Sequence, residues 1–219
     1  ISKIAAMKNA VGNFIDQVTA NATGDPATNE DDVTHRIGIV KFSGNESDQI
    51  GNDTYRSDGN TYNYSQAVQD LTSVTGNVQS LKNAVNELAA AGSTRTDFGL
   101  NQAQRVLDGD WQHGLGGARE EAKQVVVVFT DGEPSTFSNW SGGVAANAVN
   151  LAKDLKDDKV TVYTIGMFED ADPSDTDGRF NKYMNGVSSN YPNATATNRF
   201  GQASWNFCNL GTRVTEGNY

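Results

Sequence analysis

Two short segments of the sequence carry oxygen-bearing side chains that are suited to binding a metal ion. The segment TDGEPS follows an unbroken apolar run and supplies Asp131 and Glu133, and the segment GSTRTDFGL supplies Thr94, Thr96 and Asp97. Hydroxyl and carboxylate oxygens without His or Cys suit a hard divalent cation. We expect Mg²⁺, with Mn²⁺ or Ca²⁺ as alternatives, because Mg²⁺ keeps several waters and needs only one or two carboxylates.

Each of these side chains also has an ordinary structural interpretation. Asp131 could cap a helix or sit in the turn after a strand, and Thr94 could cap the helix that follows it. Thr96 or Asp97 could make that cap instead, which would leave Thr94 for the metal. Glu133 is better interpreted as a carboxylate at the rim of the site or in solvent than as a ligand.

The elements next to these segments predict where the oxygen atoms lie. Residues 124–130 and 159–168 are apolar runs typical of buried strands, and residues 141–158 between them have the spacing of an amphipathic helix. Strands that are apolar on both faces belong to a parallel sheet covered by helices on both sides. We therefore predict an α/β, doubly wound, mostly parallel sheet flanked by helices. Such sheets bind ligands at the carboxyl ends of their strands, where Asp131 falls.

The rest of the chain predicts further alternating elements. Helices are expected at residues 3–20, 77–90, 97–107 and 179–187, a strand at residues 35–43, and a weak edge strand at residues 67–74. Residues 44–66 are rich in Asn, Asp, Gly and Tyr, so we interpret them as a surface insertion with a tight hairpin at Asp58-Gly59.

Length and charge limit the function. The chain has 219 residues, a net charge of −10 and a pI of about 4.6, which fits one domain, 1–219, that repels nucleic acid and anionic membranes. No apolar run approaches the ~20 residues that span a bilayer, and no signal-peptide pattern is present. Because the sequence starts at Ile1, we expect a mature or excised segment of a larger surface protein.

No set of residues indicates catalysis. His35 and His113 lie far apart without an acidic pattern, and Ser135 is not in a Gly-x-Ser-x-Gly elbow, so we expect a protein that is not an enzyme. The lone Cys208 is expected to be a small semi-buried residue or a loop thiol. The segment DPSDTDGRF fails the calcium-loop pattern, so a turn and helix cap is predicted there.

Aromatic residues offer a second kind of candidate surface. Aromatic side chains often anchor protein interfaces, and ordinary packing explains them equally well. The residues concerned are Tyr55, Tyr62, Tyr64, Trp140 and Trp205.

The two oxygen-rich segments, in this order, resemble the metal-ion-dependent adhesion site of the von Willebrand factor type A domain. The likeness rests on VVVVFTDGEPS, on GSTRTDFGL and on VTVYTIGM as the next strand, and it covers roughly residues 1–168. The resemblance implies that Thr94 and Asp131 occupy metal positions, directly or through water. The Asn- and Thr-rich loops favour the domains of Gram-positive surface adhesins and pilus-tip proteins.

The sequence departs from the family pattern at both ends. The family's site starts with Asp-x-Ser-x-Ser after the first, central strand, and this motif does not occur in the sequence. The resemblance therefore leads us to expect that the first strand and the last strand or helix lie outside residues 1–219. A sheet without its central strand would leave unpaired backbone groups on the two neighbouring strands.

The function implied by the resemblance is cell adhesion. The expected partner is an acidic group of a host extracellular-matrix or cell-surface protein, or a neighbouring pilin-like domain, bound outside the cell at the cell wall through the metal ion. Nucleic acid and direct membrane insertion are not expected. A metal-independent scaffold domain of a pilus or surface protein is the alternative, and a type A domain of an intracellular ATPase-associated complex is a weaker one.

Overall fold

The computed structural model describes most of the chain, and the elements below are drawn from that part. The described residues are 2–24, 33–44, 54–57, 60–63, 65–109, 117–136, 139–169, 172, 174–197 and 207–214. The helices are α1 (Lys3–Ala20), α2 (Val78–Asn86), α3 (Thr96–Asp108), α4 (Gly142–Asp157) and α5 (Arg179–Val187). The strands are β1 (Arg36–Lys41), β2 (Thr54–Ser57), β3 (Asn60–Asn63), β4 (Gln66–Ser73), β5 (Val125–Thr130), β6 (Ser135–Thr136), β7 (Asn139–Trp140), β8 (Thr161–Gly166), β9 (Thr195–Ala196) and β10 (Cys208–Asn209).

Local signals explain where several helices begin and end. The Ser2 hydroxyl accepts a hydrogen bond from the Ala5 N–H and so caps α1, and Ser141 caps α4 through the Val144 N–H. α3 ends at Gly109, whose φ of 79° gives the left-handed conformation that glycine adopts at little cost. The helices predicted at residues 3–20, 97–107, 141–158 and 179–187 are confirmed to within one residue at each end.

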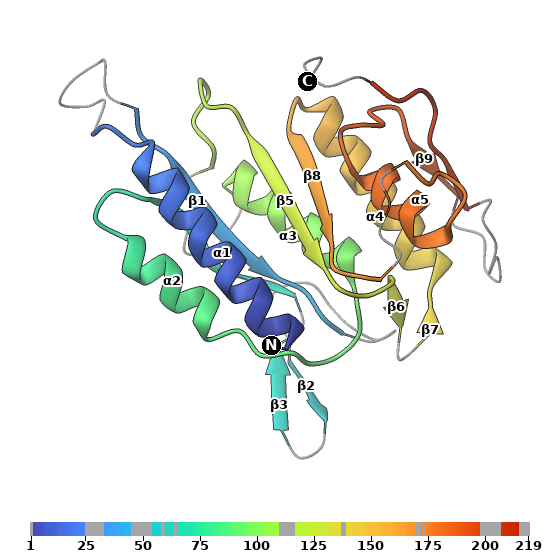
Figure 1. The fold of residues 1–219 in the computed structure, drawn as a ribbon, viewed down its shortest axis with the longest axis horizontal. Helices are drawn as coiled ribbons and strands as arrows, with labels where there is room; N and C mark the ends of the chain where they lie inside the picture. Colours follow the sequence, from blue (N-terminus) through green and yellow to red (C-terminus); the bar gives the residue numbers. More distant parts are fainter. Residues whose placement is uncertain are drawn as a thin grey trace.

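The predicted parallel strand pair is confirmed. β5 and β8 are parallel neighbours, in register from Val125 opposite Thr161 to Thr130 opposite Gly166. α4 lies between them in sequence and packs against β8. The Val-rich run and the amphipathic helix after it therefore form one strand–helix–strand unit (Figure 1).

The other described strands pair in antiparallel fashion. β1 pairs with β4, so the edge strand predicted at residues 67–74 is confirmed, and the short pairs β6–β7 and β9–β10 were not predicted. Each ladder among the described residues has two strands, and β5–β8 is the one parallel ladder. The prediction of one mostly parallel sheet is therefore met only in part, because no strand of the described part is hydrogen-bonded between β1 and β5.

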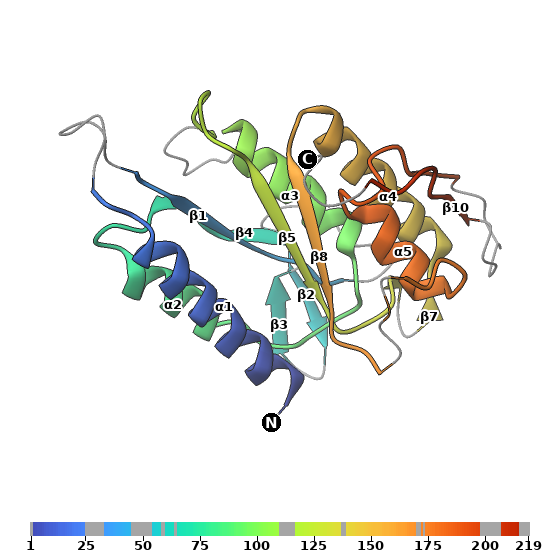
Figure 2. The same ribbon diagram turned by 45° about the horizontal axis from the view of Figure 1, so that its top comes forward.

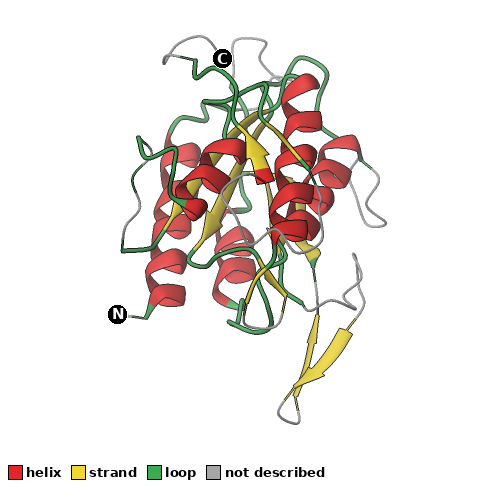
Figure 3. Cartoon of the chain, turned by 90° about the vertical axis from the view of Figure 1, so that its right-hand side faces the viewer, coloured by secondary structure: helices red, strands yellow, loops and turns green. Residues whose placement is uncertain are grey.

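β2 and β3 form the hairpin expected from the sequence. Thr54 pairs with Asn63 and Ser57 with Asn60, which places the connection at Asp58-Gly59, two residues that lie outside the described part. Figure 3 shows this hairpin projecting away from the helices. The assignment of residues 44–66 as an insertion remains a prediction.

Helices cover both faces of the β1–β4 pair. On one face, Ile37 and Ile39 of β1 pack against Ile15 of α1. The same cluster includes Val74, just after β4, and Leu81 and Val85 of α2. On the opposite face, Val106 of α3 packs with Ala67 and Leu71 of β4. Figures 1 and 2 show α1 and α2 together beside β1, away from α4 and α5.

The largest core lies on one face of the β5–β8 pair. Val128 and Val162 pack there against buried residues of α4 and α5, including Val149 and Tyr183, neither of which is exposed to solvent. The opposite face of the same strands is different, because Tyr163 and Ile165 are 45% and 40% exposed.

None of the described helices is long and apolar enough to cross a membrane.

Candidate metal site

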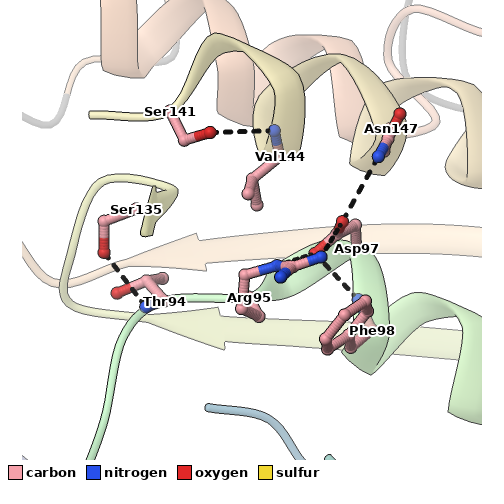
Figure 4. Close-up of polar contacts among 8 residues, drawn as sticks. All are labelled: Thr94, Arg95, Asp97, Phe98, Ser135, Ser141, Val144 and Asn147. Carbon is pink, nitrogen blue, oxygen red and sulfur yellow. Dashed lines mark hydrogen bonds and ion pairs between the residues drawn. The ribbon is translucent and has the colours of Figure 1, made fainter. Parts of the chain in front are cut away.

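Three loops meet at one edge of the strands. Ser93, just before α3, donates its N–H to the Gly44 carbonyl after β1, at 2.7 Å. The next residue, Thr94, is joined to the turn after β5 by two hydrogen bonds of 3.0 Å: Thr94 N–H to Ser135 Oγ, and Ser135 N–H to the Thr94 carbonyl (Figure 4). The carboxyl ends of β1 and β5 therefore lie at one edge, together with the start of α3.

The structure brings the segments of Thr94 and Asp131 into contact. A Cβ atom placed on Gly132 would lie 3.2 Å from Thr94 Oγ1, so the glycine after Asp131 permits a close approach of the threonine hydroxyl. Neither residue takes the capping role that was its structural alternative. The N-cap of α3 is Arg95 and that of α4 is Ser141.

Asp131 is the exposed carboxylate of this edge. Its side chain is 54% exposed, and its Oδ2 lies 3.9 Å from the ammonium of Lys3 at the start of α1. Lys3 Nζ also donates to the Asp131 carbonyl at 3.4 Å. Thr130, which ends β5, donates its hydroxyl to the Gly132 carbonyl at 3.1 Å and so fixes the turn that carries Asp131.

Asp97, predicted at the rim of the site, is instead part of a buried ion pair. It is 3% exposed, and its two oxygens accept hydrogen bonds of 2.9 Å from Nε and Nη2 of Arg95. The Phe98 N–H and the Asn147 amide also donate to it, at 3.0 and 3.4 Å (Figure 4). Its charge is therefore neutralised within the protein, and its oxygens are already engaged.

The two other predicted rim residues are also engaged or covered. Thr96 is fully buried beside Tyr183, and burial raises the pKa of Tyr183 while the Thr96 hydroxyl acts in the opposite direction. Glu133 accepts hydrogen bonds of 2.6 and 2.5 Å from Arg179 Nη2, one to each carboxylate oxygen. Arg179 in turn lies 4.6 Å from the centre of the Trp140 ring.

Three of the five aromatic residues considered as interface anchors lie in the described part of the chain: Tyr55, Tyr62 and Trp140. Trp140 makes edge contacts with Tyr183 and Phe207, at ring-centre distances of 6.3 and 5.4 Å, so it packs onto the main core. Tyr55 and Tyr62 are backbone partners in the β2–β3 ladder. Tyr64 and Trp205 lie outside the described residues.

The acidic segment before α5 forms the predicted turn, but no side chain makes the predicted helix cap, because the N-cap residue of α5 is Gly178. Asp172 Oδ1 accepts hydrogen bonds from the Ser174 hydroxyl and N–H, and Asp175 Oδ1 accepts from the N–H groups of Asp177 and Gly178. These hydrogen bonds hold the pKa of both carboxyls below their ordinary value. The carboxylates therefore organise the chain in front of α5.

A buried amine and thiol lie near the end of α5, away from this edge. Lys156 Nζ donates to the carbonyls of Gly186, Ser188 and Tyr191, and burial lowers its pKa to about 8. Cys208 is 4% exposed, and burial raises its pKa to about 11. The prediction of a small buried residue at Cys208 is confirmed.

Of the five side chains predicted for the site, Thr94 and Asp131 are the two that are neither buried nor paired with an arginine. A hydroxyl and an exposed carboxylate fit a hard cation such as Mg²⁺ that keeps several of its waters. No cluster of three or more His, Cys, Asp or Glu side chains suited to a metal occurs among the described residues. The sequence does not indicate the partners of these side chains, because their contacts are long-range or irregular; the partners are Lys3, Arg95, Ser135 and Arg179.

Comparison with known proteins assigns the family. The sequence profile of the von Willebrand factor type A domain matches residues 2–198, so the chain belongs to this family. Such domains have a Rossmann-like α/β fold and commonly mediate protein–protein binding. No curated protein is similar enough in sequence to be counted as a relative.

Solved structures of a mussel protein have a similar fold. Two crystal forms of proximal thread matrix protein 1 from the mussel byssus align with TM-scores of 0.50, at 16% and 17% identity over 85% of this chain. A third structure, described as having a zinc-occupied MIDAS motif, aligns with a TM-score of 0.49 at 16% identity, over 85% of this chain and 36% of that one. The present chain spans about a third of the length of the mussel chains, 34% and 36% in the first two. The likeness to Gram-positive adhesins remains a prediction.

Proposed function

We propose that the chain is a non-enzymatic, protein-binding module that uses a divalent cation at the edge formed by Thr94 and Asp131. The observation that carries the proposal is the double hydrogen bond between Thr94 and Ser135, which holds the Thr94 loop against the Asp131 turn. Asp131 is exposed there, whereas Asp97 and Glu133 are neutralised by arginines.

The cation, with Mg²⁺ as the first candidate, would supply positive charge to an otherwise acidic molecule of net charge −10. Thr94 and Asp131 would hold it, and its remaining positions would be open to water or to an acidic side chain of a partner. The partner class that we propose is a host extracellular-matrix or cell-surface protein, or a neighbouring pilin-like domain. The place of action that we propose is outside the cell, at the cell wall of a Gram-positive bacterium.

Relaxation of amide signals by Mn²⁺ tests the site, because it detects and locates binding that is too weak for calorimetry. We expect amides of residues 93–95 and 130–133 to broaden first as Mn²⁺ is added, and Mg²⁺ to reverse the effect. Asp131→Asn should abolish the local broadening. The matched control, Asp177→Asn, removes one negative charge from the exposed acidic turn and should leave it unchanged. Broadening centred on residues 172–178 would refute the assignment.

A second measurement addresses the partner. Binding of the chain to immobilised extracellular-matrix proteins should require Mg²⁺, disappear in EDTA and be lost in Asp131→Asn. Binding that survives both EDTA and the substitution would instead favour the metal-independent scaffold, in which the fold only packs against neighbouring domains.

A further inference from the structure

One carboxylate beside the candidate metal site, that of Glu133, is held by an arginine. Its two oxygens accept hydrogen bonds from Nη2 of Arg179, and Oε1 also accepts one from Nε at 3.1 Å. A forked pair of this kind is among the stronger hydrogen-bonded ion pairs. The two side chains are nevertheless not buried, with exposures of 38% for Glu133 and 33% for Arg179. The pair is therefore well made but open to exchange at the surface.

The backbone of Glu133 lies beside the threonine of the site. The residue before it, Gly132, would carry a Cβ atom only 3.2 Å from Thr94 Oγ1. Two residues after it, Ser135 is joined to the Thr94 backbone by two hydrogen bonds of 3.0 Å. Asp131 is two residues before it in the same turn. Because the long glutamate side chain has several staggered rotamers, this backbone position allows its carboxylate to turn either toward the arginine or toward a cation at the site.

Arg179 is the first residue of α5, where its charge does not stabilise the helix. The amino end of a helix carries partial positive charge, so a cation in the first turn opposes the helix dipole, and this turn of α5 contains no acidic residue. The contacts of Arg179 are instead directed to residues far along the chain. They are the Glu133 carboxylate and the Trp140 ring, whose centre lies 4.6 Å from the guanidinium carbon. The position of this arginine is therefore explained by the groups that it contacts.

Trp140 supports the guanidinium independently of the carboxylate. The indole ring is anchored by edge contacts with Tyr183 and Phe207, and its backbone pairs with Ser135 in the β6–β7 ladder. A guanidinium that stacks on an aromatic ring keeps its N–H groups free to donate within its own plane. Arg179 therefore retains a fixed support when its carboxylate partner turns away, which lowers the cost of opening the ion pair.

We propose that Arg179 sets the cation affinity of the site by withholding Glu133 from it. While the pair is closed, Thr94 and Asp131 supply one hydroxyl and one charged oxygen group. When the pair opens, the Glu133 carboxylate turns toward the cation and adds a second negative charge, directly or through a bound water. The affinity of an oxygen site for a hard cation depends on how many of its ligands are charged. This regulation rests on the proposed function, because it acts on the same cation site.

A double-mutant cycle tests the proposal, with Mn²⁺ affinity measured from the broadening of amide signals of residues 130–133. Arg179→Gln should raise the affinity more than about fivefold, because it frees a carboxylate for the cation. The double variant with Glu133→Gln replaces one neutral pair by another and should return to within about twofold of the parent. Lys182→Gln removes one positive charge from the same helix and is the control for net charge, with an expected gain below about twofold.

Two further measurements separate control of affinity from simple support of the fold. Arg179→Lys keeps the charge but loses the fork, so it should give a smaller gain than Arg179→Gln, and it serves as the test if Arg179→Gln does not fold. Since a cation that binds the open pair better must shift the pair toward opening, Mg²⁺ should speed hydrogen exchange at the Arg179 Nε–H. Asp131→Asn should abolish this acceleration.

The outcomes distinguish this regulation from the cation site itself. If the ion pair only supports the fold, Arg179→Gln should leave Mn²⁺ affinity at the level of the Lys182→Gln control or lower it. Either result, with the broadening still centred on residues 130–133, overturns the role of Arg179 and leaves the proposed function standing. A gain in Arg179→Gln that persists in full in the double variant also overturns it, because Glu133 would then not be the group released. Broadening centred elsewhere, or absent from the parent and Arg179→Gln alike, overturns both proposals.

Discussion

The two faces of β5 carry similar residues that differ in solvent exposure. On the packed side, Val128 is 6% exposed within the main core, and the nearby Asp97 is held by Arg95. On the open side, Val125 is 42% exposed, and Asp131 follows the end of the strand, with Lys3 near its carboxylate. Apolar character and charge therefore do not by themselves assign a role, because solvent exposure decides which side chains stabilise the fold and which can bind a partner.

The largest effect is expected for the buried carboxylate. Asp97→Ala leaves the 8%-exposed Arg95 without its counter-charge and should cost about 3–5 kcal/mol in the free energy of unfolding. Asp131→Ala, on the exposed side, should cost less than about 0.5 kcal/mol. Urea denaturation of both variants checks the difference. The double change Arg95→Met with Asp97→Leu should recover much of the loss. Equal losses for the two single variants would show that burial does not distinguish the two carboxylates.

The two valines of β5 give a matched pair for the apolar side chains. Val128→Ala removes two buried methyl groups from a closed core and should cost about 2 kcal/mol. Val125→Ala removes the same atoms from a side chain that is 42% exposed and should cost less than about 0.5 kcal/mol. Urea denaturation of both variants checks the difference, and equal losses would contradict the difference in exposure between the two valines.

A pH-dependent effect is expected on the packed side. The pKa of Lys156 is lowered from 10.5 to about 8 in the folded chain, so between these values the unfolded chain binds more protons and stability rises with pH. Cys208 acts in the opposite sense, because its pKa is raised from 9.0 to about 11 and its contribution is lost as pH rises through that range. Between pH 8 and 9 the Lys156 contribution therefore dominates, and we expect the free energy of unfolding to rise by about 1 kcal/mol over this range.

Lys156→Met separates these contributions. The variant should lose the rise in urea midpoint between pH 8 and 9, and Cys208→Ala should keep it. Lys156→Met should also be less stable than the parent at both pH values, because the Gly186, Ser188 and Tyr191 carbonyls lose their donor. Parallel pH curves for parent and Lys156→Met would show that burial of the amine does not control the dependence.

The sequence predicts the long regular elements and the position of the Thr94 loop at the same sheet edge as the turn that follows β5, for physical reasons. The apolar runs of β5 and β8 are long enough to show their burial, and parallel strands bring their carboxyl ends to one edge. The ladders β6–β7 and β9–β10 have two residues in each strand, too few for any periodic pattern. They depend on contacts between distant segments.

The same limit explains why the partners of the rim residues could not be predicted. Glu133 and Arg179 are 46 residues apart, and nothing local to either indicates that they pair. α2 ends at Asn86 although the next four residues are good helix formers, because the chain must turn at Gly92, whose φ is 72°, to bring Ser93 to Gly44. Tertiary contacts therefore override local propensity at this edge.

The smallest expected effect concerns Lys3, on the open side. Its ammonium lies 3.9 Å from Asp131 Oδ2, and both side chains are more than half exposed, so the pair contributes little to stability and Lys3→Ala should change it by less than about 0.3 kcal/mol. The ammonium nevertheless competes with a bound cation for the same carboxylate. Since two unit charges at ~4 Å in water interact by about 1 kcal/mol before salt screening, its removal should raise Mn²⁺ affinity about two- to threefold. Lys8→Ala removes the same charge from the same helix and is the control. If both variants raise the affinity equally, the effect comes from net charge, whereas an increase confined to Lys3→Ala places the cation at Asp131.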